Sequence, residues 1–202
     1  MSQVKTVLFD LGNVLVDVDL CAFWSDLGLS FPEETAPFTQ AFASLTRKYE
    51  TGHMGTADYL RGLKIVFDKK FTLGQLQGAF SRILRKPIAG MSDIVFRAAR
   101  THRTALVSNT NEIHYQLGLE RLSALGFLQK HYLSYQLHVM KPAAGFYEAI
   151  IQDQGIVPSE LLFIDDLAEN VQAAKVAGMQ TIHFKSPAQL KTALQSLHIP
   201  AQ

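Results

Sequence analysis

Residues 7–16 read Val-Leu-Phe-Asp-Leu-Gly-Asn-Val-Leu-Val, and this stretch decides the fold. The run is apolar up to one carboxylate, Asp10, and the chain turns soon afterwards at Gly12. A short apolar run that ends in a turn signal predicts a strand buried on both faces, as in a parallel sheet. The carboxyl end of such a strand faces the crevice in which α/β proteins bind ligands. We therefore expect Asp10 at the functional edge of a sheet.

Short apolar runs recur along the rest of the chain and alternate with segments of helical period. The predicted strands are Val4–Phe9, Thr104–Val107, Lys130–Ser134, Leu161–Ile164 and Gln180–Phe184. The predicted helices between them are Ser92–Arg100, Glu112–Leu122, Ala144–Gln154 and Ala168–Ala177. This alternation predicts an α/β fold with a doubly wound parallel sheet and the first strand in its middle.

The pattern changes between the first and second predicted strands. This region shows helical period and no strand pattern, with predicted helices at Cys21–Gly28, Glu33–Tyr49, Thr56–Phe67 and Leu73–Leu84. We predict an inserted helical cap over residues 17–89 and a catalytic core formed by residues 1–16 and 90–202. The tail His198–Gln202 is expected to be a frayed end.

The bulk composition excludes several classes of protein. Nineteen basic and eighteen acidic residues give a net charge of +1 with no basic run, which argues against a nucleic-acid partner. No apolar run is long enough for a membrane span, and no signal peptide is recognised. The single cysteine, Cys21, cannot form an internal disulfide and is expected to be buried. These features favour a cytoplasmic protein, and they do not indicate its oligomeric state.

The predicted second strand ends in Ser108-Asn109-Thr110-Asn111, and Lys141 precedes Pro142 at the start of a helix. The hydroxyl and backbone amides of the first group suit a bound phosphate, although the same residues are typical of a helix N-cap. A lysine at a helix start can neutralise phosphate charge, and it can equally be an exposed side chain. Both interpretations stay open for each motif taken alone.

Asp165 and Asp166 end the predicted fourth strand, and Asn170 follows one helical turn later. Paired carboxylates repel each other unless a positive charge lies beside them. Magnesium would supply that charge, since it binds through oxygen ligands and takes one or two carboxylates. A carboxylate, a hydroxyl anchor, a lysine and an acidic pair at successive strand ends together predict a site for phosphoryl transfer.

At these residues the chain resembles the haloacid dehalogenase superfamily, whose four motifs occur in this order on a five-stranded α/β core. The resemblance implies that Asp10 is the nucleophile, Ser108 the second-motif hydroxyl, Lys141 the third-motif lysine, and Asp165 with Asp166 the acidic fourth motif. It also implies that the helical insertion is a cap over the site. Within the superfamily, the segments Phe9–Asp19, Tyr49–Gly52 and Ser108–Asn111 resemble the phosphatase branch that includes bacterial α-D-glucose-1-phosphate phosphatases.

The resemblance implies a magnesium-dependent phosphatase that hydrolyses small phosphomonoesters, with a sugar phosphate favoured and a sugar 1-phosphate as one option. Asp10 would attack phosphorus and form an aspartyl-phosphate, which water then hydrolyses. The implied magnesium ligands are Asp10, the Gly12 carbonyl and Asp166, with Asp165 acting through water. The expected substrate-binding residues are Ser108, Asn109, Lys141 and, from the cap, Glu50 and His53.

The chain departs from the wider superfamily at Gly12, where a second aspartate usually acts as general acid and base. General acid or base help is worth about 10²–10⁴ in rate. One possibility is that Asp17, Asp19, a cap residue or water replaces this aspartate. The other is that the substrate has an acidic leaving group, such as the anomeric oxygen of a sugar 1-phosphate. The competing functions are a catalytically silent phosphate-binding protein, a phosphomutase and a dehalogenase. His114 is expected to be structural.

Overall fold

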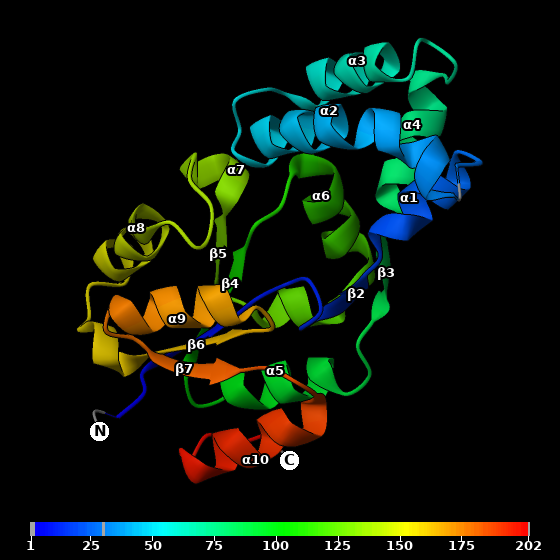
Figure 1. Cartoon of the computed structure of the whole chain (residues 1–202). Coiled ribbons are helices and arrows are strands. Elements are labelled where there is room, and N and C mark those ends of the chain that lie inside the picture. The colour runs from blue at the N-terminus through cyan, green and yellow to red at the C-terminus, as the bar shows by residue number, and fades with distance from the viewer. Residues whose placement is uncertain (1–2, 30, 202) are drawn as a thin grey trace.

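The computed structural model describes residues 3–29 and 31–201. At its centre is a five-stranded sheet in the order β5-β4-β1-β6-β7, with all four strand pairs parallel (Figure 1). The strands are β1 (Thr6–Phe9), β4 (Arg103–Ser108), β5 (Lys130–Leu133), β6 (Leu161–Asp165) and β7 (Gln180–His183). The predicted α/β fold is confirmed, and the first strand lies in the middle of the sheet.

Alternate residues of β1 pack against different layers of helices, as expected for a strand buried on both faces. Val7 and Phe9 belong to a core cluster with α5 (Met91–Ala99) and α10 (Pro187–Ser196). Leu8 packs on the opposite face with α8 (Ala144–Gln154) and α9 (Ala168–Val176). The connections between the strands also contain α6 (Glu112–Arg121), η1 (Ser123–Phe127), α7 (Ser134–Leu137) and η2 (Pro158–Glu160).

Four helices lie between β1 and β4 in the chain and form a separate group above the sheet (Figure 1). They are α1 (Leu20–Asp26), α2 (Pro32–Glu50), α3 (Thr56–Val66) and α4 (Leu73–Ser81). This group has its own aromatic core, in which Phe23 stacks on Phe42 with ring centroids 4.6 Å apart and Trp24 is buried. The division into a core (1–16 and 90–202) and a cap (17–89) stays a proposal, and the separate hydrophobic cluster supports it.

The expectation of no strand within residues 17–89 is wrong. β2 (Val16–Val18) and β3 (Leu84–Pro87) form an antiparallel ribbon where the chain enters and leaves the helical group. The predicted helix Leu73–Leu84 therefore ends early, at Ser81. The segments that enter and leave the helical group run side by side, and their pairing satisfies backbone N–H and C=O groups of both. The sequence pattern within either segment alone does not predict this pairing.

Two smaller expectations are also wrong. The tail is packed rather than frayed, since Ile199 and Ala201 are 1% and 2% exposed and the Ile199 amide donates to the Leu194 carbonyl at 2.9 Å; Gln202 lies outside the described residues. Cys21 is exposed, because the buried face of α1 carries Phe23 and Trp24. Within the described residues, no helix combines the length and the hydropathy needed to cross a membrane.

Candidate active site

Three predicted site residues meet at the carboxyl edge of the sheet. Asp10 follows β1, Ser108 ends β4 and Asp165 ends β6. The Asp10 amide donates to the Ile164 carbonyl at 3.0 Å, which continues the β1–β6 ladder up to the nucleophile position. Because these strands are parallel neighbours, their ends bring all three side chains to one edge.

Lys141 lies at the centre of this edge and is almost completely buried. Its Nζ is 2.7 Å from Oδ1 of Asp10 and 2.7 Å from Oδ2 of Asp165, and it donates to the Val107 carbonyl at 3.1 Å. These contacts use the three donors of the ammonium group. Lys141 is therefore a fixed positive charge between the two carboxylates.

The electrostatics of this group follow from its burial and its charges. Burial disfavours the ammonium of Lys141, but Asp10 and Asp165 outweigh it and raise the Lys141 pKa. Burial raises the pKa of Asp10 to about 7, although Lys141 acts in the opposite direction. Lys141 thus stays charged at neutral pH and favours the ionised form of Asp10, the form that attacks phosphorus.

Asn109 holds the backbone of Lys141. Its Nδ2 donates to the Lys141 carbonyl at 2.9 Å, and its Oδ1 accepts from the Lys141 amide at 2.8 Å. The sequence predicts Asn109 as a substrate ligand, and the structure shows its amide positioning the lysine. Asn109 and Ser108 line the same cavity.

Asp10, Asp165 and Asp166 form a group of oxygen donors that suits a metal ion. Their candidate ligand atoms all lie within 4.8 Å of one another. Three carboxylates against one lysine leave a formal charge of −2, which a divalent cation balances. Asn170 supports the group, since its Nδ2 donates to both Asp165 oxygens at 3.0 and 3.1 Å.

Two further observations fit a hydrated cation at this place. Oδ1 of Asn170 is a buried acceptor with no hydrogen-bond partner among the described residues. Burial raises the pKa of Asp166, and Nδ2 of Asn13 donates to its Oδ2 at 3.2 Å. A nearby divalent cation would favour the ionised form of such a carboxylate.

Gly12 lies two residues after the nucleophile position and next to the β2–β3 ribbon. A Cβ atom at this position would lie 3.1 Å from Cγ2 of Val18, so a side chain fits only if Val18 shifts slightly. The proposed role of the Gly12 carbonyl as a metal ligand needs no side chain.

A cavity of about 840 Å³ lies between this edge and the helical group. The core contributes Gly12, Ser108 and Asn109 to its wall, and one face of α2 contributes Arg47 and Glu50. Glu50 therefore shares a cavity wall with Ser108 and Asn109, and Asp10, Lys141 and Asp166 are not part of that wall. His53 is not part of this wall; it is exposed on the loop after α2, with Nδ1 2.7 Å from Oγ1 of Thr51.

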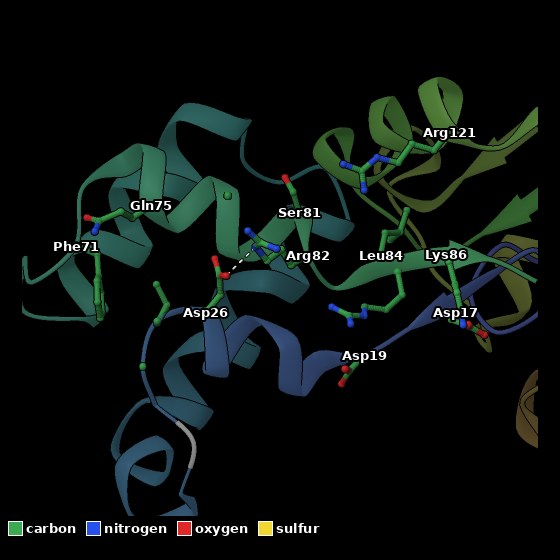
Figure 2. Close-up of a pocket in the computed structure, with 14 residues that line it drawn as sticks. Asp17, Asp19, Asp26, Phe71, Gln75, Ser81, Arg82, Leu84, Lys86 and Arg121 are labelled. Carbon is green, nitrogen blue, oxygen red and sulfur yellow. Dashed lines mark ion pairs between the residues drawn. The ribbon is translucent and has the colours of Figure 1, made fainter.

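Asp17 and Asp19, the other candidates for the missing acid, line a different pocket (Figure 2). Figure 2 shows them with Arg82, Lys86 and other charged residues around the β2–β3 ribbon and α4. Asp19 also caps α1, since its Oδ1 accepts from the Cys21 amide at 3.0 Å. Neither residue is in the wall of the cavity that contains Gly12.

Sequence reasoning missed Arg47 and Asn13. Arg47 has a detectable signal, because it precedes Glu50 by three residues and so shares its helix face. Asn13 lies just after the Asp10–Gly12 turn with φ of 52°, a backbone conformation that asparagine tolerates well. His114, which is expected to be structural, is buried, stacks on Phe80 and bonds to its carbonyl, and it also contributes to the cavity wall.

Comparisons with known proteins agree with this geometry. A D-ribitol-5-phosphate phosphatase from Bacteroides thetaiotaomicron is 25% identical over 89% of this chain and 91% of that protein. The crystal structure of HAD family enzyme BT-2542, from the same organism, is 25% identical with a TM-score of 0.87 and covers 96% of this chain and 99% of that one. A mutant of that enzyme, 25% identical with a TM-score of 0.79 over 91% and 95% of the two chains, was solved with magnesium and inorganic phosphate.

The prediction of a hydrolase is confirmed at the level of the family, and these relatives support a phosphoric monoester hydrolase that uses magnesium. The family model for haloacid dehalogenase-like hydrolases matches residues 4–178, which include every predicted motif. The chain belongs to the haloacid dehalogenase-like hydrolase family.

Proposed function

We propose that the protein is a magnesium-dependent phosphatase that hydrolyses a small phosphorylated sugar or sugar alcohol. The observation that carries this proposal is the position of Lys141, whose Nζ lies 2.7 Å from both the Asp10 and the Asp165 carboxylates. A nucleophile, a fixed cation and a group of metal-binding oxygens thus lie together. This is the combination that transfer of a phosphoryl group requires.

In the proposed reaction, Asp10 attacks phosphorus and forms an aspartyl-phosphate. Lys141 favours the ionised form of Asp10 and offsets the charge of the transferring group. The Ser108 hydroxyl and the backbone beside Asn109 hold the phosphate. Asp10, the Gly12 carbonyl and Asp166 would hold magnesium, with Asp165 acting through water. The bound ion supplies further positive charge to the phosphate oxygens.

The substrate class rests on the cavity and on the relatives. A volume of about 840 Å³ accommodates a small molecule. The curated relative acts on ribitol 5-phosphate, which is a primary alkyl phosphate. The finer likeness to α-D-glucose-1-phosphate phosphatases stays a prediction. A panel that contains sugar 1-phosphates, pentitol 5-phosphates and hexose 6-phosphates separates these possibilities.

The absence of a side chain at Gly12 favours one alternative, a phosphate-binding protein of the same fold with little or no turnover. A phosphomutase must move protons between two hydroxyls and depends on the missing acid still more. Phosphate binding without release from any ester identifies the first alternative. Conversion of one sugar phosphate into its isomer, without phosphate release, identifies the second.

The test is release of inorganic phosphate from the panel, with magnesium and with a chelator. We expect magnesium-dependent turnover that the Asp10→Asn substitution abolishes, because an amide keeps the shape of the side chain but does not attack phosphorus. Asp68→Asn, in an exposed loop, is the matched control and keeps full activity. Cell fractionation tests the proposed cytoplasmic location.

A further inference from the structure

The proposed reaction needs a group that gives a proton to the leaving oxygen and later takes one from water. Position 12 carries no side chain for this purpose. Among the residues that the structure describes, Glu50 is the one carboxyl group in the wall of the cavity that contains Gly12, Ser108 and Asn109. Asp17 and Asp19 belong to the separate pocket of Figure 2.

Glu50 ends α2, and the Asn111 side chain of the core favours its ionised form. Nδ2 of Asn111 also lies 3.1 Å from Nδ1 of His114, and Nε2 of His114 lies 2.8 Å from the Phe80 carbonyl. Because a carbonyl only accepts, His114 carries its proton on Nε2 and accepts from Asn111 at Nδ1. These bonds fix the orientation of the Asn111 amide.

The surroundings of Glu50 suit a group that both donates and accepts a proton. Burial raises the pKa of Glu50 to about 7, while the Asn111 side chain acts in the opposite direction. The other ionisable groups near it are Arg47 in the same wall, His114, and Tyr59 on α3. Burial lowers the pKa of His114 to about 4, so His114 is neutral when Glu50 titrates. Both forms of Glu50 are therefore populated near neutral pH.

We propose that Glu50 is the catalytic acid and base of this enzyme, in place of the side chain that Gly12 lacks. The proposal rests on the proposed phosphatase function. In the first step Asp10 bonds to phosphorus, the bond between phosphorus and the ester oxygen breaks, and that oxygen takes the electron pair and the Glu50 proton. In the second step the Glu50 carboxylate takes a proton from water, whose oxygen bonds to phosphorus and releases Asp10.

The test compares leaving groups in the wild-type protein and in Glu50→Gln, with magnesium present. Pentitol 5-phosphate has a poor leaving group and 4-nitrophenyl phosphate a good one. We expect the substitution to lower kcat/KM for the alkyl ester by about 10²–10⁴ and for the aryl ester by less than tenfold. The aryl ester should also show a burst of nitrophenol, because the aspartyl-phosphate forms but water is no longer deprotonated.

Two further variants keep this test specific. Glu50→Asp retains a carboxyl group and should recover part of the activity on the alkyl ester. Asp19→Asn keeps the cap of α1 and should leave both esters unaffected. Equal losses for the two esters in Glu50→Gln, or a rise in KM alone, would overturn the proposal and assign Glu50 to substrate binding.

The outcomes also separate this inference from the proposed function. A wild-type protein that releases no phosphate from any ester overturns both. An active wild-type protein, inactivated by Asp10→Asn but with the same leaving-group dependence in Glu50→Gln, keeps the phosphatase function and overturns only the role of Glu50.

Discussion

Nζ of Lys141 lies 2.7 Å from Oδ1 of Asp10, and the two residues are only 3% and 7% exposed. Removal of the lysine leaves buried carboxylates without their positive partner, which typically costs about 3–5 kcal/mol. We expect Lys141→Met to lose about this much unfolding free energy when magnesium is chelated. Added magnesium should recover a large part of the loss, because the ion then offsets two of the three carboxylate charges.

Chemical unfolding of both proteins, with magnesium and with a chelator, measures this effect. Lys130→Met is the control, since Lys130 pairs with Asp153 at the surface and such pairs contribute about 0–1 kcal/mol. If magnesium stabilised the wild-type and Lys141→Met proteins by the same amount, the acidic group would not be the magnesium site.

Because His114 is buried, the free energy of unfolding should fall as the pH falls. Burial lowers its pKa from 6.5 to about 4, so between these values the unfolded chain binds the proton that the folded protein excludes. The contribution of His114 is present above pH 6.5 and is lost as the pH falls toward 4. Between pH 7 and pH 5 we expect it to fall by about 2 kcal/mol.

Urea unfolding of the wild-type protein and of His114→Gln at the two pH values isolates this contribution. The variant should be less stable at pH 7, and its stability should change less between pH 7 and pH 5. His102 is a control, because burial lowers its pKa too but it lies at the surface turn before β4. An unchanged pH dependence in His114→Gln would contradict the neutral, buried state of this residue.

The strand-end residues were predictable because the signals are local. Asp10, Ser108 and Asp165 each end a run of buried apolar residues, and parallel pairing brings such ends together. Lys141 does not end a strand, and its signal was its place before Pro142 at the start of a helix, which an exposed lysine fits equally well. Its position between two carboxylates rests on the Asn109 bonds, which join segments 32 residues apart.

The contacts between the helical group and the core were not predictable in the same way. Glu50 was a candidate, but its place in one cavity wall with Ser108 and Asn109 joins α2 to the end of β4, and no local period encodes this arrangement. The β2–β3 ribbon was missed for the same reason, because each of its strands is short and lacks an alternating pattern. Cys21 was expected to be buried from its residue type alone, without regard to its helix face.

The loop at Gly52 packs closely against the core, so a side chain at this position should disturb the contact between the helical group and the core. Its φ is 69°, and an added Cβ atom would lie 2.0 Å from the Tyr135 carbonyl oxygen. The neighbouring Thr51 carbonyl accepts from Nδ1 of His138 at 3.1 Å. Gly52→Ala must therefore displace this loop, and Glu50 lies only two residues before it. We expect a rise in KM and a fall in kcat of about tenfold or more, without global unfolding.

Steady-state kinetics and a thermal melt separate docking from folding. Gly28→Ala is a matched control, because Gly28 has a similar φ of 73° but an added Cβ atom meets nothing within 4 Å. Its backbone strain is comparable, about 1–2 kcal/mol, and its kinetics should stay close to wild type. Equal kinetic changes in the two variants would mean that backbone strain, and not the contact with Tyr135, is responsible.

A carboxyl group at position 12 should take over the proposed role of Glu50. A side chain there approaches Cγ2 of Val18, which is 39% exposed and has room to move. In the Glu50→Gln background, Gly12→Asp should raise the rate on pentitol 5-phosphate at least tenfold, because the new carboxyl provides the missing proton transfer. Gly12→Asn has the same shape without an acidic proton and should give no recovery. In the wild-type background Gly12→Asp should add little, since Glu50 already performs this step. A double variant that still hydrolyses the aryl ester but gains nothing on the alkyl ester would show that position 12 is too far from the leaving oxygen in this chain.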